Sequence, residues 1–166
     1  MNDLPSTITI PQFITRLEGL DAGDRARLKR NAGRSLAEAR GATGLFYRLM
    51  GQAIPDYQED IYFLVATLFP LAEGGGEGNL GDALHKAQSQ NTLKGLDRRI
   101  EVLLDSDRVQ LPFRLRQAIH FIQSNRVKVN WSRLLQDLLN WDHPDRFVQK
   151  SWARAYFSEP VQSKNH

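Results

Sequence analysis

Residues 111–124 of this 166-residue chain read Leu-Pro-Phe-Arg-Leu-Arg-Gln-Ala-Ile-His-Phe-Ile-Gln-Ser. Four apolar residues in this stretch recur at i, i+3, i+4 and i+7, a spacing that places them on one face of an α-helix. They are Leu115, Ala118, Ile119 and Ile122. Pro112 suits the first turn of such a helix, because its missing N–H has no partner to lose there. The stretch therefore predicts an amphipathic helix with one face buried in a core.

The polar positions of this predicted helix carry positive charge and no negative charge. They are Arg114, Arg116, Gln117, His120 and Gln123. A helix with one apolar face and one cationic face can pack on a core and still contact an anion. An ordinary solvated face, whose acidic partners come from neighbouring helices, explains the same pattern equally well.

Charge is unevenly placed along the chain, although the net charge is only +3. Residues 21–50 carry +4, residues 51–92 carry −5 and residues 93–128 carry +4. A fold that brings the two basic segments together would build one continuous basic face, with the acidic residues 56–60 away from it. The cations expected on that face are Lys29, Arg30, Arg98, Arg99 and Arg116, with Arg108 between or beside them.

The composition is typical of a soluble globular chain, with 41% hydrophobic and 25% charged residues. The sequence contains no cysteine, which excludes disulfide and thiolate chemistry and fits a reducing cytoplasm. The N-terminus lacks the basic and apolar regions of a signal peptide, and the longest apolar run, Ile61–Phe69, is too short to span a bilayer. We therefore expect a cytoplasmic protein without membrane contact.

Periodicity, capping residues and helix breakers predict an all-α fold, a compact bundle of about eight to nine helices. The expected starts are Thr9 or Ile10, Asp21, Ser35, Pro55, Asn79, Leu93, Leu111, Asn130 and Asp145. The polar connector Gln88–Thr92 suggests two small lobes within one compact unit, an N-terminal lobe of residues 1–90 and a C-terminal lobe of residues 91–166. Residues 158–166 are expected to fray.

The glycine-rich segment Glu73–Asn79 is predicted to be a flexible loop. Gly76, Gly78 and Gly81 match the spacing G-x-G-x-x-G. A dinucleotide site is nevertheless a poor interpretation, because a helix and a proline precede the motif where a strand is required. The glutamates of the segment would also repel a pyrophosphate.

The sequence offers no convincing constellation for catalysis or metal binding. The histidines form no i, i+3 or i+4 pairs that would suit a zinc site: His85, His120, His143 and His166. The sequence His143-Pro144-Asp145 imitates a His–Asp pair, but no nucleophile motif accompanies it. No phosphate-binding loop or spaced carboxylate cluster is present. We therefore predict a binding protein that is not an enzyme and uses no cofactor or metal.

Several short motifs, in their order along the chain, resemble those of one family. They are Leu20-Asp21-Ala22-Gly23 with Leu28-Lys29-Arg30, Phe46-Tyr47-Arg48-Leu49, Leu80-Gly81-Asp82-Ala83-Leu84, Arg98-Arg99-Ile100 with Asp107-Arg108, Leu115-Arg116, and Val129-Asn130-Trp131 with Leu134-Leu135. Together with the length and the helical pattern, they resemble the CasB-type small subunit of the type I-E CRISPR Cascade complex. The similarity runs from about Leu17 to Phe157.

This resemblance implies a non-catalytic helical subunit of an antiviral surveillance complex, present as two copies beside the backbone subunits and the large subunit. It implies that a basic surface holds the crRNA, the target DNA and the displaced strand without reading sequence. The motif cations that the resemblance assigns to nucleic acid are Lys29, Arg30, Arg48, Arg98, Arg99, Arg108 and Arg116. Gln117 stands where a second basic residue is expected, and Arg114 is the candidate to replace it.

Two other classes of protein fit parts of the pattern. A helical adaptor that binds only protein would use the same arginines to pair with acidic partner surfaces. A helix-turn-helix regulator is less well supported, because no short turn places a polar recognition helix after a supporting helix.

Overall fold

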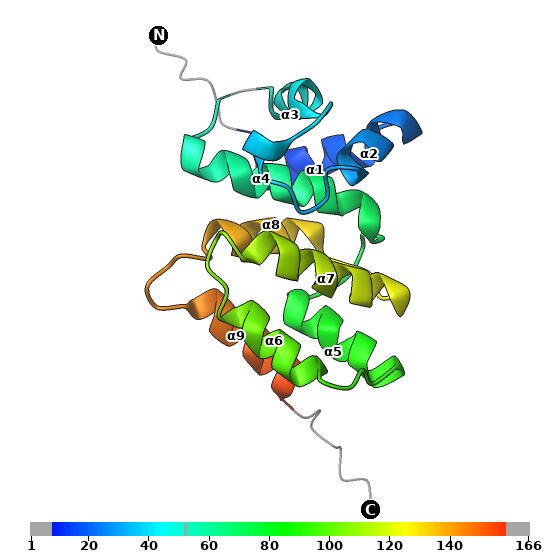
Figure 1. Ribbon diagram of the computed structural model, residues 1–166, viewed down its shortest axis with the longest axis vertical. Helices are drawn as coiled ribbons and strands as arrows, with labels where there is room; N and C mark the ends of the chain where they lie inside the picture. The colour runs from blue at the N-terminus through cyan, green and yellow to red at the C-terminus, as the bar shows by residue number, and fades with distance from the viewer. Residues whose placement is uncertain (1–7, 52, 159–166) are drawn as a thin grey trace, which may run out of the picture.

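The computed structural model describes residues 8–51 and 53–158. Within them it contains nine α-helices and no β-strand, which confirms the predicted all-α class (Figure 1). The helices are α1 (Ile10–Glu18), α2 (Ala22–Lys29), α3 (Thr43–Met50), α4 (Asp56–Leu68), α5 (Leu80–Gln90), α6 (Leu96–Leu104), α7 (Leu111–Ser124), α8 (Trp131–Leu139) and α9 (Phe147–Phe157). Two 3₁₀ turns are η1 (Leu36–Glu38) and η2 (Phe69–Leu71). The predicted fraying of the C-terminus falls almost entirely outside the described residues.

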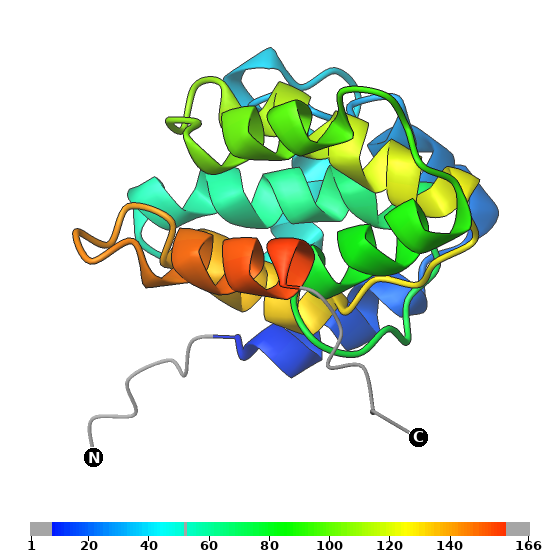
Figure 2. The same cartoon turned by 90° about the horizontal axis from the view of Figure 1, so that it is seen from below.

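The helices stack in three tiers. Helices α1 to α4 form one end, α7 and α8 lie in the middle, and α5, α6 and α9 form the other end (Figure 1). Seen from that other end, α5, α6 and α9 cover the helices behind them (Figure 2). One connected hydrophobic cluster extends through all three tiers. Helix α7 therefore sits between the two ends of the molecule.

The burial of α7 follows its apolar spacing. Leu115, Ile119 and Ile122 are fully buried, and Ala118 is nearly so. The helix begins at Leu111, the residue before Pro112, as the sequence predicts. Its opposite side stays exposed, so the amphipathic interpretation of this stretch is confirmed.

Helix α4 is the most completely buried helix of the bundle. Every residue from Ile61 to Leu68 is buried, because the helix packs against α2 on one side and α7 and α8 on another. The three tryptophans are buried as predicted, and each indole N–H finds an acceptor in the core. Trp131 donates to the carbonyl of Ala72 and Trp141 to that of Ser106, at 3.2 and 2.9 Å.

Local capping signals place most helix starts correctly. The side chains of Thr9, Asp21, Asn79 and Asn130 accept hydrogen bonds from backbone N–H groups of the first turns of α1, α2, α5 and α8. The helix predicted after Ser35 is wrong, because this segment forms only the single turn η1. Buried Asn31 binds the backbone after η1 and prevents the helix from continuing. The Asn31 side chain donates to the carbonyl of Arg40 and accepts from the N–H of Arg40.

The predicted flexible loop at Glu73–Asn79 is also wrong in its first half. The N–H of Val129 donates to the carbonyl of Glu73 at 2.9 Å, and the N–H of Gly76 donates to the carbonyl of Val129 at 3.2 Å. A Cβ on Gly76 would lie 2.4 Å from the carbonyl oxygen of Lys128. Glycine is needed at position 76 because the two backbones approach each other closely. The hydrogen bonds to Val129 then hold this part of the segment in place, where the sequence predicted flexibility.

The predicted division of the chain near residue 90 places α5 with the N-terminal helices. In the structure α5 packs mainly against α9 and also against α7, at the end of the bundle formed by C-terminal helices. The chain crosses from one end to the other between α4 and α5. A division into two lobes stays a prediction, and the continuous hydrophobic cluster joins the two ends.

Candidate nucleic-acid interface

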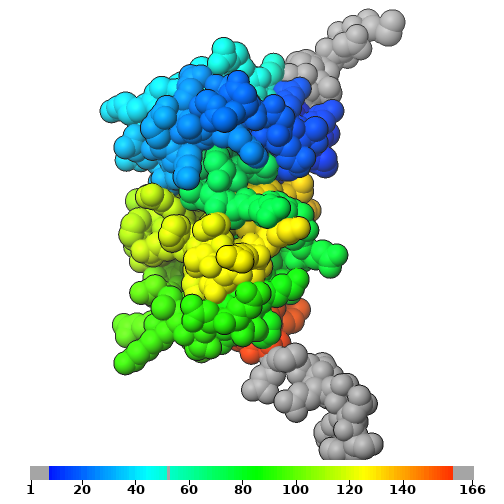
Figure 3. All heavy atoms as spheres, turned by 90° about the vertical axis from the view of Figure 1, so that its right-hand side faces the viewer, coloured from blue at the N-terminus to red at the C-terminus, as the bar shows by residue number. Residues whose placement is uncertain are grey.

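The segment that follows α2 packs against α7 at Gly33 and so brings parts of two predicted cationic segments together. A Cβ on Gly33 would lie 3.3 Å from Cδ of Arg116 and 3.7 Å from the carbonyl oxygen of Pro112. Near this contact, Lys29 of α2 and Gln123 of α7 both line one open depression. We call this depression, of about 1110 Å³, the α2–α7 groove. In Figure 3, α2 (blue) and the turn after α7 (yellow) flank it.

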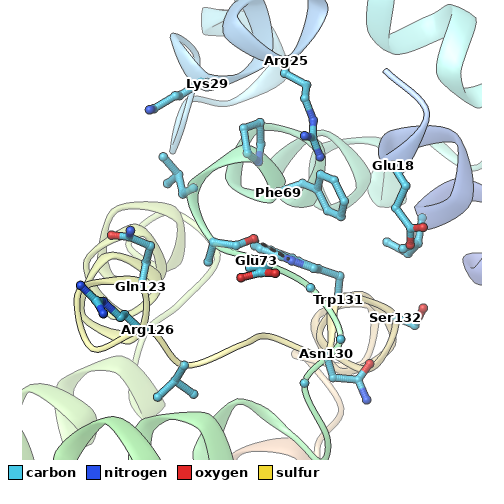
Figure 4. A pocket seen from close by; sticks show the side chains of 18 of the residues that line it. Glu18, Arg25, Lys29, Phe69, Glu73, Gln123, Arg126, Asn130, Trp131 and Ser132 are labelled. Carbon is cyan, nitrogen blue, oxygen red and sulfur yellow. Dashed lines mark hydrogen bonds between the residues drawn. The ribbon is translucent and has the colours of Figure 1, made fainter. Parts of the chain in front are cut away.

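Three cations and two carboxylates line the α2–α7 groove (Figure 4). The cations are Arg25, Lys29 and Arg126, and the carboxylates are Glu18 and Glu73. Neither carboxylate forms an ion pair with a cation among the described residues. The lining therefore carries a net positive charge and leaves its cations available to an anionic ligand.

Arg25 and Arg126 were not among the cations predicted from the sequence. The guanidinium of Arg25 lies over the ring of Phe69, 5.6 Å from its centroid, which holds the charge at the groove wall. Arg126 adopts the left-handed conformation with φ +59°, which is uncommon for a residue with a Cβ. The predicted basic turn at residues 125–129 signalled Arg126, but only the fold places it in the groove.

Lys29, Arg30 and Arg116 are exposed, and none of them pairs with a carboxylate in the described part of the chain. Helix α2 has only two acidic residues of its own. Asp21 caps the helix, and Asp24 pairs with Arg27 at 3.1 Å. Arg25 and Lys29 of α2 therefore form no ion pair with a carboxylate within the described residues.

Arg98 and Arg99 lie on α6, on the other side of α7. They border a second depression between α6 and α7, which we call the α6–α7 groove. Within residues 8–51 and 53–158 neither arginine pairs with a carboxylate, although Glu101 follows Arg98 at i+3 on the same helix. The two predicted basic segments thus flank the exposed side of α7 from opposite sides.

Arg108 and Arg114 have partners within the fold. Nε of Arg108 donates to the carboxylate of Asp142, and its Nη1 donates to the carbonyl of Tyr57 at 3.0 Å. Nη1 of Arg114 lies 3.0–3.2 Å from three acceptors, which are the carbonyl of Val102, Oγ of Ser106 and Oε1 of Gln110. These arginines join neighbouring segments of the bundle, so they are weaker candidates for phosphate binding than the sequence suggests.

Arg48 is exposed on α3, in the tier farthest from α6 (Figure 1). Of the two aromatic residues before it, Phe46 is fully buried, whereas Tyr47 is 47% exposed. The hydroxyl of Tyr47 donates to Glu59 at 2.9 Å, and this bond raises the pKa of the tyrosine. Arg48 therefore does not belong to the surface around α7.

The predicted acidic residues at the start of α4 do not line the α2–α7 groove. Asp60 instead accepts from the N–H of Leu36 at 3.0 Å and so caps η1. The carboxylates that do line the groove are Glu18, at the end of α1, and Glu73, in the segment after η2. The sequence did not predict that these two residues lie there.

Comparison with known proteins identifies the family. A family model for CRISPR-associated protein Cse2 matches residues 24–157. The chain belongs to the Cse2 family. The Cse2 protein of Thermus thermophilus is 34% identical over 155 residues, which cover 87% of this chain and 86% of that protein.

Solved structures of Cse2 and CasB proteins share the fold. CasB from M. ruber superposes with a TM-score of 0.74 at 28% identity, over 92% of this chain and 94% of that chain. A Cse2-family protein from Thermus thermophilus gives 0.75 at 28% identity, over 89% and 95%. A chain in the structure of E. coli Cascade bound to a PAM-containing dsDNA target has the same fold, with a TM-score of 0.64 at 19% identity over 91% and 97%.

The residues of the short motifs quoted from the sequence serve two different purposes in this structure. Leu80, Leu84 and Leu115 are buried, whereas Lys29 and Arg116 are exposed beside the α2–α7 groove. These motifs therefore combine residues that build the core of this chain with residues that remain exposed at its surface.

Potential metal-ligating side chains do not form a cluster in the described residues. No three His, Asp or Glu side chains among them gather as a metal site would require. Nδ1 of His85 lies 3.1 Å from the carbonyl of Tyr156, and Nδ1 of His143 accepts from the N–H of Asp145 at 3.1 Å. His166 lies outside the described residues. No helix between residues 8 and 158, residue 52 apart, is long and apolar enough to cross a membrane.

Proposed function

We propose that this Cse2-family chain is a non-catalytic subunit of a Cascade surveillance complex that holds nucleic acid through its α2–α7 groove. The observation that carries the proposal is that Arg25, Lys29 and Arg126 line one groove and form no ion pair with a carboxylate among the described residues. Exposed Arg30 follows Lys29 in the sequence, and exposed Arg116 lies beside Gly33. Such unpaired cations suit the phosphate backbone, which supplies affinity without sequence information. The fold shared with a chain of E. coli Cascade bound to dsDNA supports the same role.

The proposal extends to the partners implied by the family. These are the crRNA, the target DNA with its displaced strand, the backbone subunits, the large subunit and a second copy of this chain. The absence of a phosphate-binding loop and of a nucleophile motif in the sequence supports a binding role over a catalytic one. Co-purification with a guide RNA and the other Cascade subunits is the expected result in the native host.

We propose a smaller ligand set than the sequence alone suggests. The groove-lining cations Arg25, Lys29 and Arg126 are the core of the proposed interface, and the exposed cations Arg30 and Arg116 extend it. Arg108 and Arg114 hold intramolecular partners, and Arg48 lies on α3. Assignment of Arg98 and Arg99 to nucleic acid stays a prediction, because they border the separate α6–α7 groove.

The test is a titration of the full-length chain with a fluorescent single-stranded oligonucleotide and a duplex at graded salt. We expect one phosphate contact from each of the five proposed cations, which are Arg25, Lys29, Arg30, Arg116 and Arg126. Five phosphate contacts predict a slope of log K against log salt of about −3.5 for a single strand. Lys29→Ala should reduce the magnitude of that slope by about one unit. It should leave the unfolding free energy within about 0.5 kcal/mol, because Lys29 is exposed.

The matched control is Lys150→Ala, which removes an exposed lysine on α9, away from the groove. This control should keep the wild-type slope. An affinity that does not respond to salt, or equal effects of the two lysine variants, would refute the proposed interface. The protein-only adaptor would then be the better interpretation.

A further inference from the structure

The α6–α7 groove has an apolar character that sets it apart from the rest of the surface. Its volume is about 380 Å³, and its floor contains the buried residues Ile100, Leu103 and Ala118. Large apolar side chains on its walls remain open to solvent, with Phe113 62% and Val102 38% exposed. Exposed apolar surface of this kind, gathered in a concave site, is typical of an interaction site.

The edge of the groove is cationic. Lys94, Arg98 and Arg99 line it and are exposed, and no Asp or Glu is among its lining residues. Asp97 of α6 points elsewhere, since it accepts a hydrogen bond from Tyr156 on α9 at 2.7 Å, and Glu101 is not among the groove-lining residues. An occupant that buries apolar groups in the groove therefore meets three unpaired positive charges at its border.

The groove is preformed by an internal brace. Arg114 projects from α7 to the carboxyl end of α6, where its guanidinium donates to the carbonyl of Val102 and to Oγ of Ser106. Ser106 in turn donates to the same carbonyl at 2.9 Å. Because these hydrogen bonds already hold the two walls in place, binding of an occupant does not carry the free-energy cost of ordering them.

We propose that the α6–α7 groove docks an acidic amphipathic segment of a partner protein. Apolar side chains at i, i+3, i+4 and i+7 of the segment enter between Val102 and Phe113, as in other helix-in-groove complexes. Carboxylates flanking these anchors pair with Lys94, Arg98 and Arg99. This docking is independent of phosphate binding in the α2–α7 groove. In this proposal Arg98 and Arg99, which the sequence assigned to nucleic acid, contact a partner protein.

A nucleobase fits this groove less well than a protein side chain. The floor is aliphatic, and Gln117 carries the only side-chain amide among the lining residues, so the polar edges of a buried base would lose their hydrogen bonds to water. Aliphatic anchors carry no such groups. Complementary charge at the border further favours a segment that carries carboxylates.

The test uses the full-length chain and a fluorescein-labelled helical peptide of about 16 residues. The peptide carries leucines at i, i+3, i+4 and i+7 with glutamates beside them, and a matched peptide carries glutamine in place of each glutamate. We expect the glutamate peptide to bind with a micromolar Kd and the glutamine peptide about tenfold more weakly. Phe113→Ser and Arg99→Ala should each weaken the glutamate peptide about tenfold.

Matched control variants are Phe147→Ser and Arg154→Ala, which change an exposed aromatic and an exposed arginine on α9. They should leave peptide affinity unchanged. The Arg99→Glu variant should no longer bind the glutamate peptide. It should instead bind a peptide in which lysines replace the glutamates. This charge reversal separates docking from a loss of folding, which far-UV circular dichroism checks in each variant.

Three results would overturn the proposal. They are no peptide binding at about 1 mM protein, equal affinities of the Phe113→Ser and Phe147→Ser variants, and displacement of the peptide by an oligonucleotide whose own binding requires Phe113. The last result would assign the groove to nucleobases. The salt titration of Lys29→Ala reports on the α2–α7 groove alone, so the two proposals fail separately.

Discussion

Gly81 provides a sharp test of how α5 is held against α9. A Cβ placed on this residue would lie 2.2 Å from the carbonyl oxygen of Trp152 and 2.9 Å from its Cα and carbonyl carbon. All three are backbone atoms, so no side-chain rotation can relieve the overlap. Gly81→Ala therefore requires the two helices to separate by about 1 Å, and overpacking of this kind costs about 1–3 kcal/mol.

The expected loss lies at the upper end of that range because the contact is with backbone. For a chain of this length, a loss of about 3 kcal/mol corresponds to a fall in Tm of roughly 6–12 °C. The measurement is thermal and urea unfolding followed by far-UV circular dichroism. The same variant should keep the salt-dependent slope of nucleic-acid binding, because Gly81 lies outside the α2–α7 groove.

Gly44→Ala is the matched control. Gly44 lies in the first turn of α3 at negative φ, and an added Cβ meets nothing within 4 Å. Alanine restricts the unfolded chain and should stabilise the protein by about 0.5–1 kcal/mol. The two substitutions are chemically identical and are expected to act in opposite directions. A Gly81→Ala variant as stable as the wild type, or more stable, would refute the close packing of α5 on α9.

Two further predictions concern buried polar groups. Asp137→Ala should lower the unfolding free energy by about 1–3 kcal/mol in urea, because buried Asp137 accepts from the indole N–H of Trp152 at 2.8 Å and from Arg133 at 3.1 Å. Asp137→Asn retains one acceptor and should lose less. Burial and the hydrogen bond to Asp97 raise the pKa of Tyr156, so above pH about 10 the unfolded chain releases this proton first. Stability should therefore fall as pH rises through that range, and Tyr156→Phe should flatten this part of the urea-unfolding profile.

Local sequence signals were sufficient for most of the secondary structure. The spacing of Leu115, Ile119 and Ile122 gives the buried face of α7, because helix geometry brings these positions to one side. Thr9 and Asn79 mark helix starts, because a cap acts within one turn. The same local rules failed where distant groups compete, as Asn31 does by binding the backbone of Arg40.

The candidate surfaces depended on contacts between distant parts of the chain. The sequence supplied the exposed cations Lys29 and Arg116, but the approach of Arg116 to the segment after α2 results from the packing of Gly33 against α7. It could not exclude Arg114, because the acceptors of that guanidinium lie largely on another element of the bundle. Nor could it find the role of Arg126, whose position depends on an uncommon backbone conformation.

The sequence by itself determined the helical class, the buried faces and the family motifs, because helix periodicity and capping act over a few residues. Only the tertiary structure decided which cations remain free, that α5 joins the C-terminal helices, and that the glycine-rich segment is pinned to Val129. These features depend on close approach between segments tens of residues apart. Such approach is set by the packing of the whole core, which no local pattern encodes.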